Sequence, residues 1–227
     1  MKKEINLKEI KKSILVFVLF YFSSYLQLIP IYAFNLNLSN LSGTNKVLLS
    51  IFSNTILLSI LILLYKNELI EDFKKYKNKL ASNIDTGFKY WFFGLIGMFI
   101  SNIIINVIMK NGQAENEKIV QQMISYAPIL MIINAGLIAP IIEEITFRKA
   151  FKNVLKGKWL FILTSGIIFG SLHVITKLTT PIDLLYIIPY SSLGIAFAYM
   201  YYKTDTIYTS TTMHIIHNSI LTILSIM

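Results

Sequence analysis

Long apolar runs separated by short polar segments dominate the hydrophobic pattern of the chain. Seven of these runs approach the roughly 20 residues that a helix needs to cross a bilayer. The pattern therefore predicts an all-α fold: a polytopic membrane helix bundle of about seven transmembrane helices, with room for an eighth. The predicted spans are residues 13–34, 47–65, 90–109, 127–147, 159–176, 183–202 and 206–226.

The basic residues alternate with these spans. If the N-terminus is cytoplasmic, the inside segments hold 17 of the 21 Lys and Arg residues and the outside segments hold 4. Cytoplasmic loops of membrane proteins carry such an excess of basic residues. We therefore expect a multi-pass protein of the cell membrane with a cytoplasmic N-terminus, whose first apolar run is a retained span. The predicted inside segments are 1–12, 66–89, 148–158 and 203–205.

Composition agrees with this topology and narrows the partners. Hydrophobic residues make up 55% of the 227 residues and charged residues only 15%. The formal net charge of +9 does not indicate nucleic-acid binding, because the lysines lie between apolar spans, where topology requires them. The chain contains no cysteine, which excludes disulfides and thiolate metal sites. The expected partner is the membrane.

Two polar segments interrupt the spans. Residues 66–89 carry Leu69, Phe73, Tyr76 and Leu80 at helical spacing, which is typical of an amphipathic surface helix. A solvated linker with basic topology signals is the other interpretation. Residues 110–122 indicate an external loop that leads into a helix. We divide the chain into N-terminal membrane helices, 1–125, and a second membrane region, 126–227, which holds the candidate functional residues described next.

Ionisable and amide side chains gather in or beside the apolar spans of the last third of the chain. Such groups are costly inside a membrane and are by default candidates for a functional site. Few other ionisable groups are available to the interior, so one shared site is expected. The set comprises Glu143, Glu144, Arg148, His173, His214, His217 and Asn218.

The adjacent carboxylates are expected to have different roles. Glu144 and Arg148 are four residues apart, so they share a helix face and can form an ion pair. Glu143 points about 100° away and is left without this cation. The arrangement favours a structural Glu144 and a chemical Glu143 that acts as general base. The alternative is that both glutamates pair with lysines at the membrane edge.

A helical hairpin would bring Glu143 level with His173. If residues 128–155 form one helix and the chain turns near Gly157, Glu143 lies 14 residues before the turn and His173 lies 16 after it. At about 1.5 Å per residue, these heights agree within a few ångströms. The other interpretation of His173 is a simple helix–helix contact.

The sequence around His173 also favours close packing. Phe169 lies one turn before His173 and on the same face. Gly166 and Gly170 in the same run allow another helix to approach closely.

The last span supports two kinds of chemistry. His214 and His217, three residues apart, could form a metal-binding pair on one helix turn. His214 and Asn218, four residues apart, could instead donate hydrogen bonds to a developing oxyanion. The spacing leaves both open. The polar run Thr209–Thr212 predicts a partly hydrated cavity entered from the cytoplasmic side.

Zinc is the metal that this chemistry would suit. A catalytic zinc commonly has three protein ligands and a water molecule. Glu143, His173 and His214 supply suitable ligand atoms. A mechanism without metal is equally compatible with the residues.

Three short motifs occur in order in this region. "EEITFR" fits Glu-Glu-x-x-x-Arg, "FGSLH" fits Phe-x-x-x-His, and "HIIHN" fits His-x-x-x-Asn. With these motifs the chain resembles the CPBP family of intramembrane proteases, which comprises the type 2 CAAX-prenyl endopeptidases and their bacterial relatives, also called the Abi family. The resemblance covers about residues 125–225.

The resemblance implies a role for each motif residue. Glu143 would activate the attacking water, and His173 would assist it. His214 and Asn218 would stabilise the oxyanion or contribute to a metal site.

The remaining motif residues would support this set. Glu144, Arg148 and Phe169 would hold the catalytic groups in place, whereas His217 falls at a variable motif position and receives no role. The expected activity is that of a metallo- or glutamate-type endopeptidase acting on a membrane peptide or protein.

Two other functions compete with proteolysis. An inactive scaffold that binds membrane peptides would be expected to have lost motif residues, and none is lost here. An ion transporter would be expected to show inverted repeats or paired broken helices, and the sequence shows neither. The family resemblance further implies a bacterial role in bacteriocin or pheromone maturation, self-immunity or envelope regulation, among which the residues do not choose.

Overall fold

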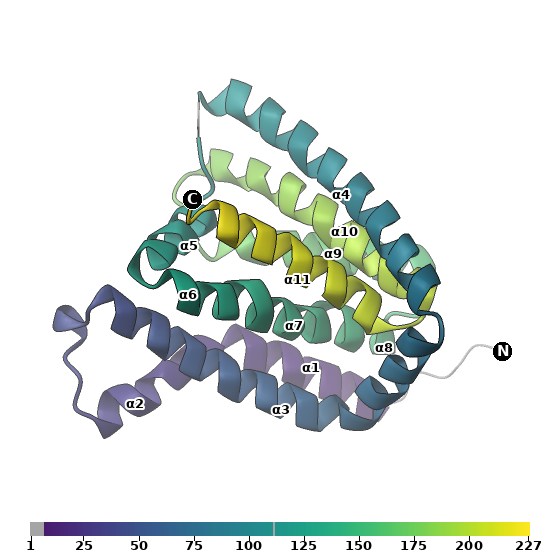
Figure 1. Cartoon of the computed structure of the whole chain (residues 1–227), viewed down its shortest axis with the longest axis horizontal. Coiled ribbons are helices and arrows are strands. Elements are labelled where there is room, and N and C mark those ends of the chain that lie inside the picture. Colours follow the sequence, from purple (N-terminus) through teal and green to yellow (C-terminus); the bar gives the residue numbers. More distant parts are fainter. Residues whose placement is uncertain (1–6, 111) are drawn as a thin grey trace.

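The computed structural model describes residues 7–110 and 112–227. Within these residues the regular structure is entirely helical, which confirms the predicted all-α membrane bundle (Figure 1). The predictions for Lys2 and Lys3 in the first inside segment, and for Asn111 in the external loop, lie outside the described residues.

The first predicted span is a bent pair of helices. α1 (Leu7–Tyr21) is followed by a 3₁₀ turn, Ser23–Gln27, and by α2 (Leu28–Ala33). The two parts meet at an angle of 56°. The apolar pattern of residues 13–34 predicts their helicity but not this bend.

The polar segment 66–89 is neither a separate surface helix nor a linker, so both interpretations are wrong. α3 (Gly43–Asn78) and α4 (Leu80–Met109) continue through it and meet at Lys79. Two polar side chains fix the segment from inside. Asp72 is buried and accepts a hydrogen bond from Lys149 at 2.9 Å, and Asn83 donates to the carbonyl oxygen of Tyr76 at 3.1 Å.

The helix that carries the two glutamates runs from Pro128 to Val154, close to the predicted 128–155. It follows α5 (Glu115–Tyr126) and alternates α-helical and π-helical segments. A π segment shifts the register of a helix and often occurs at functional sites. The order is α6 (Pro128–Met131), π Ile132–Ile138, α7 (Ala139–Glu143), π Glu144–Ala150 and α8 (Phe151–Val154).

The last three helices complete the bundle. They are α9 (Lys158–Ile175), α10 (Ile187–Thr204), which follows a 3₁₀ turn at Pro181–Tyr186, and α11 (Ile207–Leu224). α9 and α10 touch backbone to backbone at two glycines, as predicted. A Cβ atom on Gly166 would lie 2.6 Å from the nitrogen of Ile195, and one on Gly170 would lie 2.6 Å from that of Ser191.

The number of spans is smaller than the predicted seven. Among the described residues, five helices are long and apolar enough to cross a membrane, and the bent pair α1–α2 makes six. α11 has 18 residues and no charged side chain, but its Ser, Thr, His and Asn residues make it less apolar than those five. The same polar residues make it a wall of the site described below.

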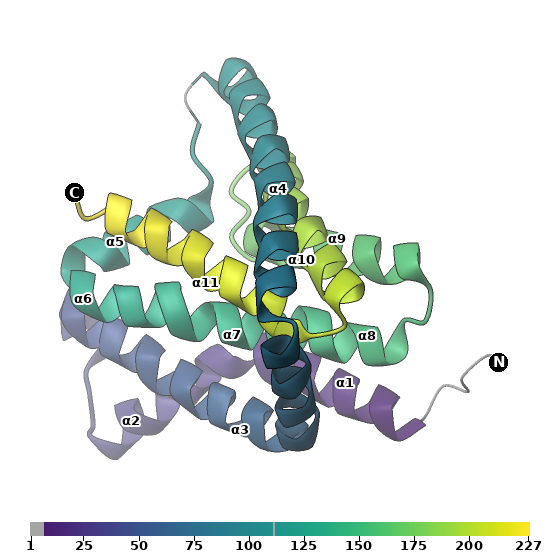
Figure 2. The ribbon, with the colours of Figure 1, turned by 45° about the vertical axis from the view of Figure 1, so that its right-hand side comes forward.

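The four predicted inside segments meet at one end of the bundle, to which we refer as the basic end. Lys12 forms an ion pair with Glu68, and Lys149 pairs with Asp72 at 2.9 Å. Lys75 and Lys152 pair with Asp205 at 2.7 and 2.8 Å. Figure 2 shows the turns between α3 and α4 and between α10 and α11 close together at this end.

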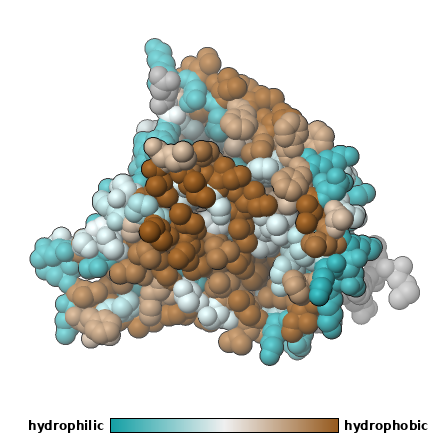
Figure 3. Space-filling view, viewed as in Figure 1, coloured by the Kyte–Doolittle hydropathy of each residue, from teal (hydrophilic) through white to brown (hydrophobic). Residues whose placement is uncertain are grey.

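An apolar band separates the basic end from the opposite end, which carries α5. In Figure 3 this band covers the middle of the visible face, with hydrophilic residues at its two sides. Exposed residues such as Phe92, Phe99, Ile103 and Val107 extend it along α4. The arrangement is that of a multi-pass membrane protein, because only a bilayer stabilises so much exposed apolar surface.

Candidate active site

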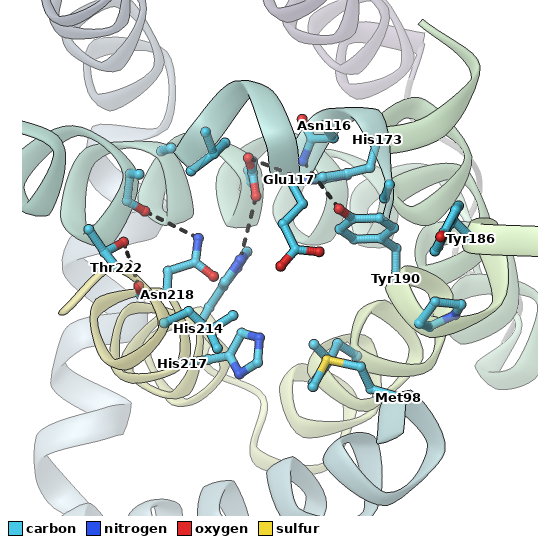
Figure 4. A pocket seen from close by; sticks show the side chains of 18 of the residues that line it. Met98, Asn116, Glu117, His173, Tyr186, Tyr190, His214, His217, Asn218 and Thr222 are labelled. Atoms are coloured by element: carbon cyan, nitrogen blue, oxygen red, sulfur yellow. Dashed lines mark hydrogen bonds and ion pairs between the residues drawn. The ribbon is translucent and has the colours of Figure 1, made fainter. Parts of the chain in front are cut away.

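Glu143 lies between two imidazole rings that come from different helices. It is the last residue of α7, and its Oε1 is 4.0 Å from Nε2 of His173 on α9. Its Oε2 is 3.5 Å from Nε2 of His214 on α11. The predicted register of the hairpin is therefore correct, and a third helix joins it. His173 and His214 point into the same cavity (Figure 4).

The ring of His173 has a fixed orientation. Its Nδ1 lies 2.8 Å from the carbonyl oxygen of Phe169. Because a carbonyl oxygen only accepts hydrogen bonds, Nδ1 carries the proton and donates it. Nε2 of the neutral ring is then an acceptor that faces Glu143. The rings of Phe169 and His173 also lie 4.4 Å apart, which restricts rotation.

Glu144 orients His214 in the same way. Its Oε1 accepts a hydrogen bond from Nδ1 of His214 at 3.0 Å and lies 3.4 Å from Nη2 of Arg148. The side chains of Glu144 and Arg148 are fully buried, so the predicted pair exists and is shielded from water. Arg148 also lies over the ring of Phe169, 4.6 Å from its centre. The other ring nitrogen of His214, Nε2, faces Glu143.

Three polar groups thus converge on one point: the carboxylate of Glu143 and the Nε2 atoms of His173 and His214. Together these groups can hold a proton, a water molecule or a cation. They are the ligand types that zinc prefers. In the described parts of the chain, however, no group of three or more His, Cys, Asp or Glu residues is spaced to hold a metal ion. Zinc binding stays a prediction that metal analysis of the purified protein tests.

Asn218 lies beside this cluster on α11. Its Nδ2 donates a hydrogen bond to the carbonyl oxygen of Ala135 at 3.2 Å. Ala135 belongs to the first π segment, where the altered register makes carbonyl groups available to side chains. An amide nitrogen has two N–H groups, so one donor of Asn218 remains for another acceptor.

His217 belongs to a different contact. It is buried, and its Nδ1 accepts a hydrogen bond from Nε1 of Trp91 on α4 at 3.4 Å. His214 and His217 therefore engage different partners. His217 lines the cavity (Figure 4). It lies within 4.0 Å of no carboxylate among the residues that the structure describes.

Two aromatic residues of α10 were missed by the sequence analysis. Tyr190 stacks on His173 with ring centres 4.9 Å apart, and Phe197 stacks on His214 at 4.6 Å. They are seven residues apart and so lie on one helix face. This spacing was the available signal, but it is also common in ordinary core helices.

Two cavities meet at Glu143. The larger has a volume of 450 Å³ and lies among α4, α5, α10, α11 and the glutamate helix. The smaller, of 380 Å³, lies among α1, α9 and the same helix. Three residues line both cavities: Asn116, Glu143 and His173.

The polar run Thr209–Thr212 lines neither of these two cavities, and access from the cytoplasmic side stays a prediction. The larger cavity extends to the end that carries α5, where Asn116, Glu117 and Gln121 line it. Within the polar run before His214, Ser210 and Thr211 both donate to the carbonyl oxygen of Ile207 at 3.0 Å. The hydroxyl of Thr209 is buried and has no hydrogen-bond partner among the described residues.

Fold and site together define a class: a multi-pass helical membrane protein with a buried carboxylate–imidazole cluster. Residues 125–220 match the family described as type II CAAX prenyl endopeptidase Rce1-like. The chain is also similar to YdiL, a candidate membrane peptidase of Bacillus subtilis (strain 168), with 29% identity over 154 residues. These matches confirm the resemblance to the CPBP family of membrane proteases.

The similarity has limits in length. The match to YdiL covers 66% of this chain and 59% of that protein, so this chain spans less than two thirds of its relative. No solved structure matches the chain.

Proposed function

We propose that the chain is an intramembrane endopeptidase that hydrolyses peptide bonds of membrane-associated peptides or proteins through a water molecule activated by Glu143. One observation carries this proposal: the carboxylate of Glu143 faces two Nε2 atoms, at 4.0 and 3.5 Å, where two cavities meet. The family similarity supports the reaction class.

The chemistry follows from these positions. Glu143 takes a proton from a water molecule as the water oxygen attacks the peptide carbonyl carbon. Nε2 of His173 accepts the second hydrogen of this water and so orients it. The carbonyl oxygen becomes negative, and the remaining N–H of Asn218 stabilises it. Protonated Glu143 then delivers its proton to the leaving nitrogen as the C–N bond breaks.

The ion pairs of the basic end support an orientation of the chain in the membrane. These pairs hold the four lysine-rich segments together, so all four lie on one side of the membrane. Because basic loops favour the cytoplasm, we place this end and the N-terminus there, in the cell membrane. The larger cavity then extends toward the outside face.

The first prediction concerns Glu143→Gln. The amide keeps the size of the carboxylate but does not accept the proton of water, so proteolysis should fall by at least about 100-fold. Membranes containing wild-type or variant protein would be incubated in ¹⁸O-water. Hydrolysis places ¹⁸O in each new terminal carboxyl group, which mass spectrometry detects.

Glu71→Gln provides a matched control, since Glu71 is exposed on α3 and far from the cavities. Thermal unfolding in detergent checks that all variants fold. Labelled peptides that occur with wild-type and Glu71→Gln protein, but not with Glu143→Gln, would support the proposal. Equal labelling in all three samples would contradict it and favour an inactive scaffold.

A further inference from the structure

His217 is the histidine that the proposed chemistry does not use. It belongs to α11 and is only 6% exposed, yet it lines the larger cavity. Figure 4 shows its ring pointing into that cavity, across from Met98. A polar group that lies beside apolar side chains needs a hydrogen-bond partner, so the state of its two ring nitrogens decides what it can bind.

The contact with Trp91 fixes which ring nitrogen of His217 carries the proton. Nε1 of Trp91 lies 3.4 Å from Nδ1 of His217, and the two rings meet edge to face with centres 6.3 Å apart. An indole N–H only donates hydrogen bonds, so Nδ1 is the acceptor and carries no proton. In the neutral ring the proton is then on Nε2. His217 therefore presents an N–H donor at Nε2.

This donor has no hydrogen-bond partner within the described part of the chain. Trp91 occupies Nδ1, and no oxygen atom of these residues accepts from Nε2. His173 and His214 differ, because Nε2 of each ring faces Glu143. An N–H group that is largely removed from water and left unpaired is costly, and an acceptor supplied by a ligand would remove this cost.

The surrounding side chains limit which acceptor can reach His217. Met98, Leu193 and Phe197 line the same cavity and suit apolar side chains of a substrate. The acceptors that an apolar peptide segment offers are its backbone carbonyl oxygens. In a helix each of these oxygens already accepts from the N–H four residues further on, whereas in an extended segment it is available.

The position of His217 relates its donor to the bond that would be cut. His217 lies three residues after His214 on α11, which is about 4.5 Å along the helix axis. Nε2 of His214 lies 3.5 Å from Oε2 of Glu143. An extended chain advances about 3.3–3.6 Å per residue. The donor is therefore placed to meet a carbonyl oxygen about one or two residues from the cut bond.

We propose that Nε2–H of His217, held in this tautomer by Trp91, donates a hydrogen bond to a backbone carbonyl oxygen of the substrate in the larger cavity. This inference rests on the proposed endopeptidase function and assigns a substrate-positioning residue to it. The contact favours an apolar segment that is extended rather than helical on this side of the cut. His217 aligns the substrate and takes no proton from it.

The tautomer is tested by ¹⁵N NMR of the histidine-labelled full chain in nanodiscs. The signals of His217 are those that His217→Gln removes. In wild-type protein the proton should be on Nε2, and in Trp91→Phe both tautomers should occur, because the donor to Nδ1 is gone. Trp159→Phe is the matched control, since Trp159 is 59% exposed on α9 and lines neither cavity. A proton on Nδ1 of His217 in wild-type protein would overturn the inference.

Two small probes test the hydrogen bond itself. Dipentyl ketone has one carbonyl oxygen between two apolar arms, and the matched alkene has a methylidene group in place of that oxygen. Equilibrium dialysis against protein in nanodiscs, with empty nanodiscs subtracted, gives the affinity of each probe. The ratio of the two affinities is then compared between protein variants, which cancels the different solubility of the probes in lipid.

Relative to the alkene, wild-type protein should bind the ketone about three- to tenfold more tightly than His217→Leu does, as expected for one hydrogen bond. His217→Gln should retain most of this preference, because its amide group also donates. Trp91→Phe should lose part of the preference and Trp159→Phe none of it. The comparison of these two tryptophan variants provides the test even if His217→Leu does not fold.

Equal ratios in wild-type protein and His217→Leu, or no binding of the ketone by wild-type protein, would overturn the inference. So would an unchanged tautomer and ratio in Trp91→Phe. The ¹⁸O assay is run in parallel. Labelled peptides without a preference for the ketone would leave the endopeptidase proposal standing, whereas the preference without labelled peptides would contradict the endopeptidase and retain the donor at His217.

Discussion

The division of work between two adjacent residues, Glu143 and Glu144, explains why the site needs both. Glu144 is fully buried and contacts a guanidinium and an imidazole, so its charge is compensated. Among the described residues, Glu143 has two imidazole nitrogens and no Lys or Arg nitrogen within 4 Å, and it lines two cavities. Glu144 holds His214 in one orientation, and Glu143 faces the space where a substrate would lie.

Removing the charge of Glu144 should therefore affect stability. Glu144→Gln leaves Arg148 buried without its counter-ion, so we expect a loss of about 3–5 kcal/mol in the free energy of unfolding. The double variant Glu144→Leu/Arg148→Met should recover much of this loss, because no buried charge remains. Unfolding of purified protein in detergent measures both. A single variant as stable as wild-type would contradict a compensated pair.

Sequence reasoning located these residues better than it described their surroundings. The spacing of Glu144 and Arg148, and the register of Glu143 with His173, follow from helix geometry. The stacking of Tyr190 and Phe197 on the histidines does not, because aromatic residues at helical spacing are as common in ordinary cores. The polar run Thr209–Thr212 was also expected to line the cavity and does not, because hydroxyl groups that bond to their own helix, such as those of Ser210 and Thr211, resemble a hydrated wall in sequence.

Contact between elements positions His173. α9 and α10 approach so closely that glycine is required at their contact, and His173 lies one turn beyond Gly170. α10 brings Tyr190 and Phe197 against the two imidazoles from the same face. The orientation of the site is thus set by how these two helices pack.

A methyl group at this contact should separate the helices. In Gly170→Ala the new Cβ would lie 2.6 Å from the nitrogen of Ser191 and 2.9 Å from the carbonyl oxygen of Ile187, which are backbone atoms. We expect a loss of about 1–3 kcal/mol in stability, with reduced proteolysis as His173 is displaced. Thermal unfolding and the ¹⁸O assay measure these two effects.

Gly97→Ala is the matched substitution on α4. Its Cβ would approach only Cβ and Oγ of Ser192, both at 3.1 Å, and no backbone atom, so a shift of a few tenths of an ångström relieves the contact. Its stability should therefore stay close to that of wild-type. Similar losses of stability in Gly170→Ala and Gly97→Ala would show that the backbone contact between α9 and α10 is not the cause of the loss.

Element boundaries were predicted with mixed success. The glutamate helix, α9 and α10 lie close to their predicted ranges because their apolar runs are bounded by clear polar segments. The segment 66–89 was misjudged because its buried anchors are polar. Asp72 is held by Lys149, which is 77 residues away, and Asn83 bonds to Tyr76 across the junction of α3 and α4, so a local apolar pattern does not reveal either contact.

On the scale of the whole molecule, the ion pairs of the basic end join segments from the beginning, middle and end of the chain. Asp205 is central, with Lys75 at 2.7 Å and Lys152 at 2.8 Å. Burial acts to raise the pKa of Asp205, but hydrogen bonds from Lys152 and Lys75 outweigh it and lower the pKa to about 2. The carboxylate is thus more favourable in the folded than in the unfolded protein.

This shift gives Asp205 a pH-dependent contribution to stability. The contribution is present above the ordinary pKa of 3.8 and is lost as the pH falls from there toward about 2. Asp205→Asn should lower the unfolding temperature modestly at pH 7, since the side chain is 67% exposed and solvent screens its pairs. Asn also tolerates the left-handed backbone at this position.

The difference between Asp205→Asn and wild-type protein should decrease at pH 2.5, where the wild-type carboxylate begins to protonate. Unfolding scans in detergent at the two pH values provide the measurement. A constant difference would indicate that the variant acts through the turn rather than through its charge.

The backbone contact between α9 and α10 also restricts how a substrate arrives. A helix dissolved in the lipid cannot slip between two elements whose main chains already touch. A substrate therefore does not enter from the lipid between α9 and α10. It must enter on another side of the bundle, where side chains rather than backbone atoms separate the lipid from the two cavities. Cross-linking of a bound substrate should therefore label α1 or α4 rather than the lipid-facing surfaces of α9 and α10.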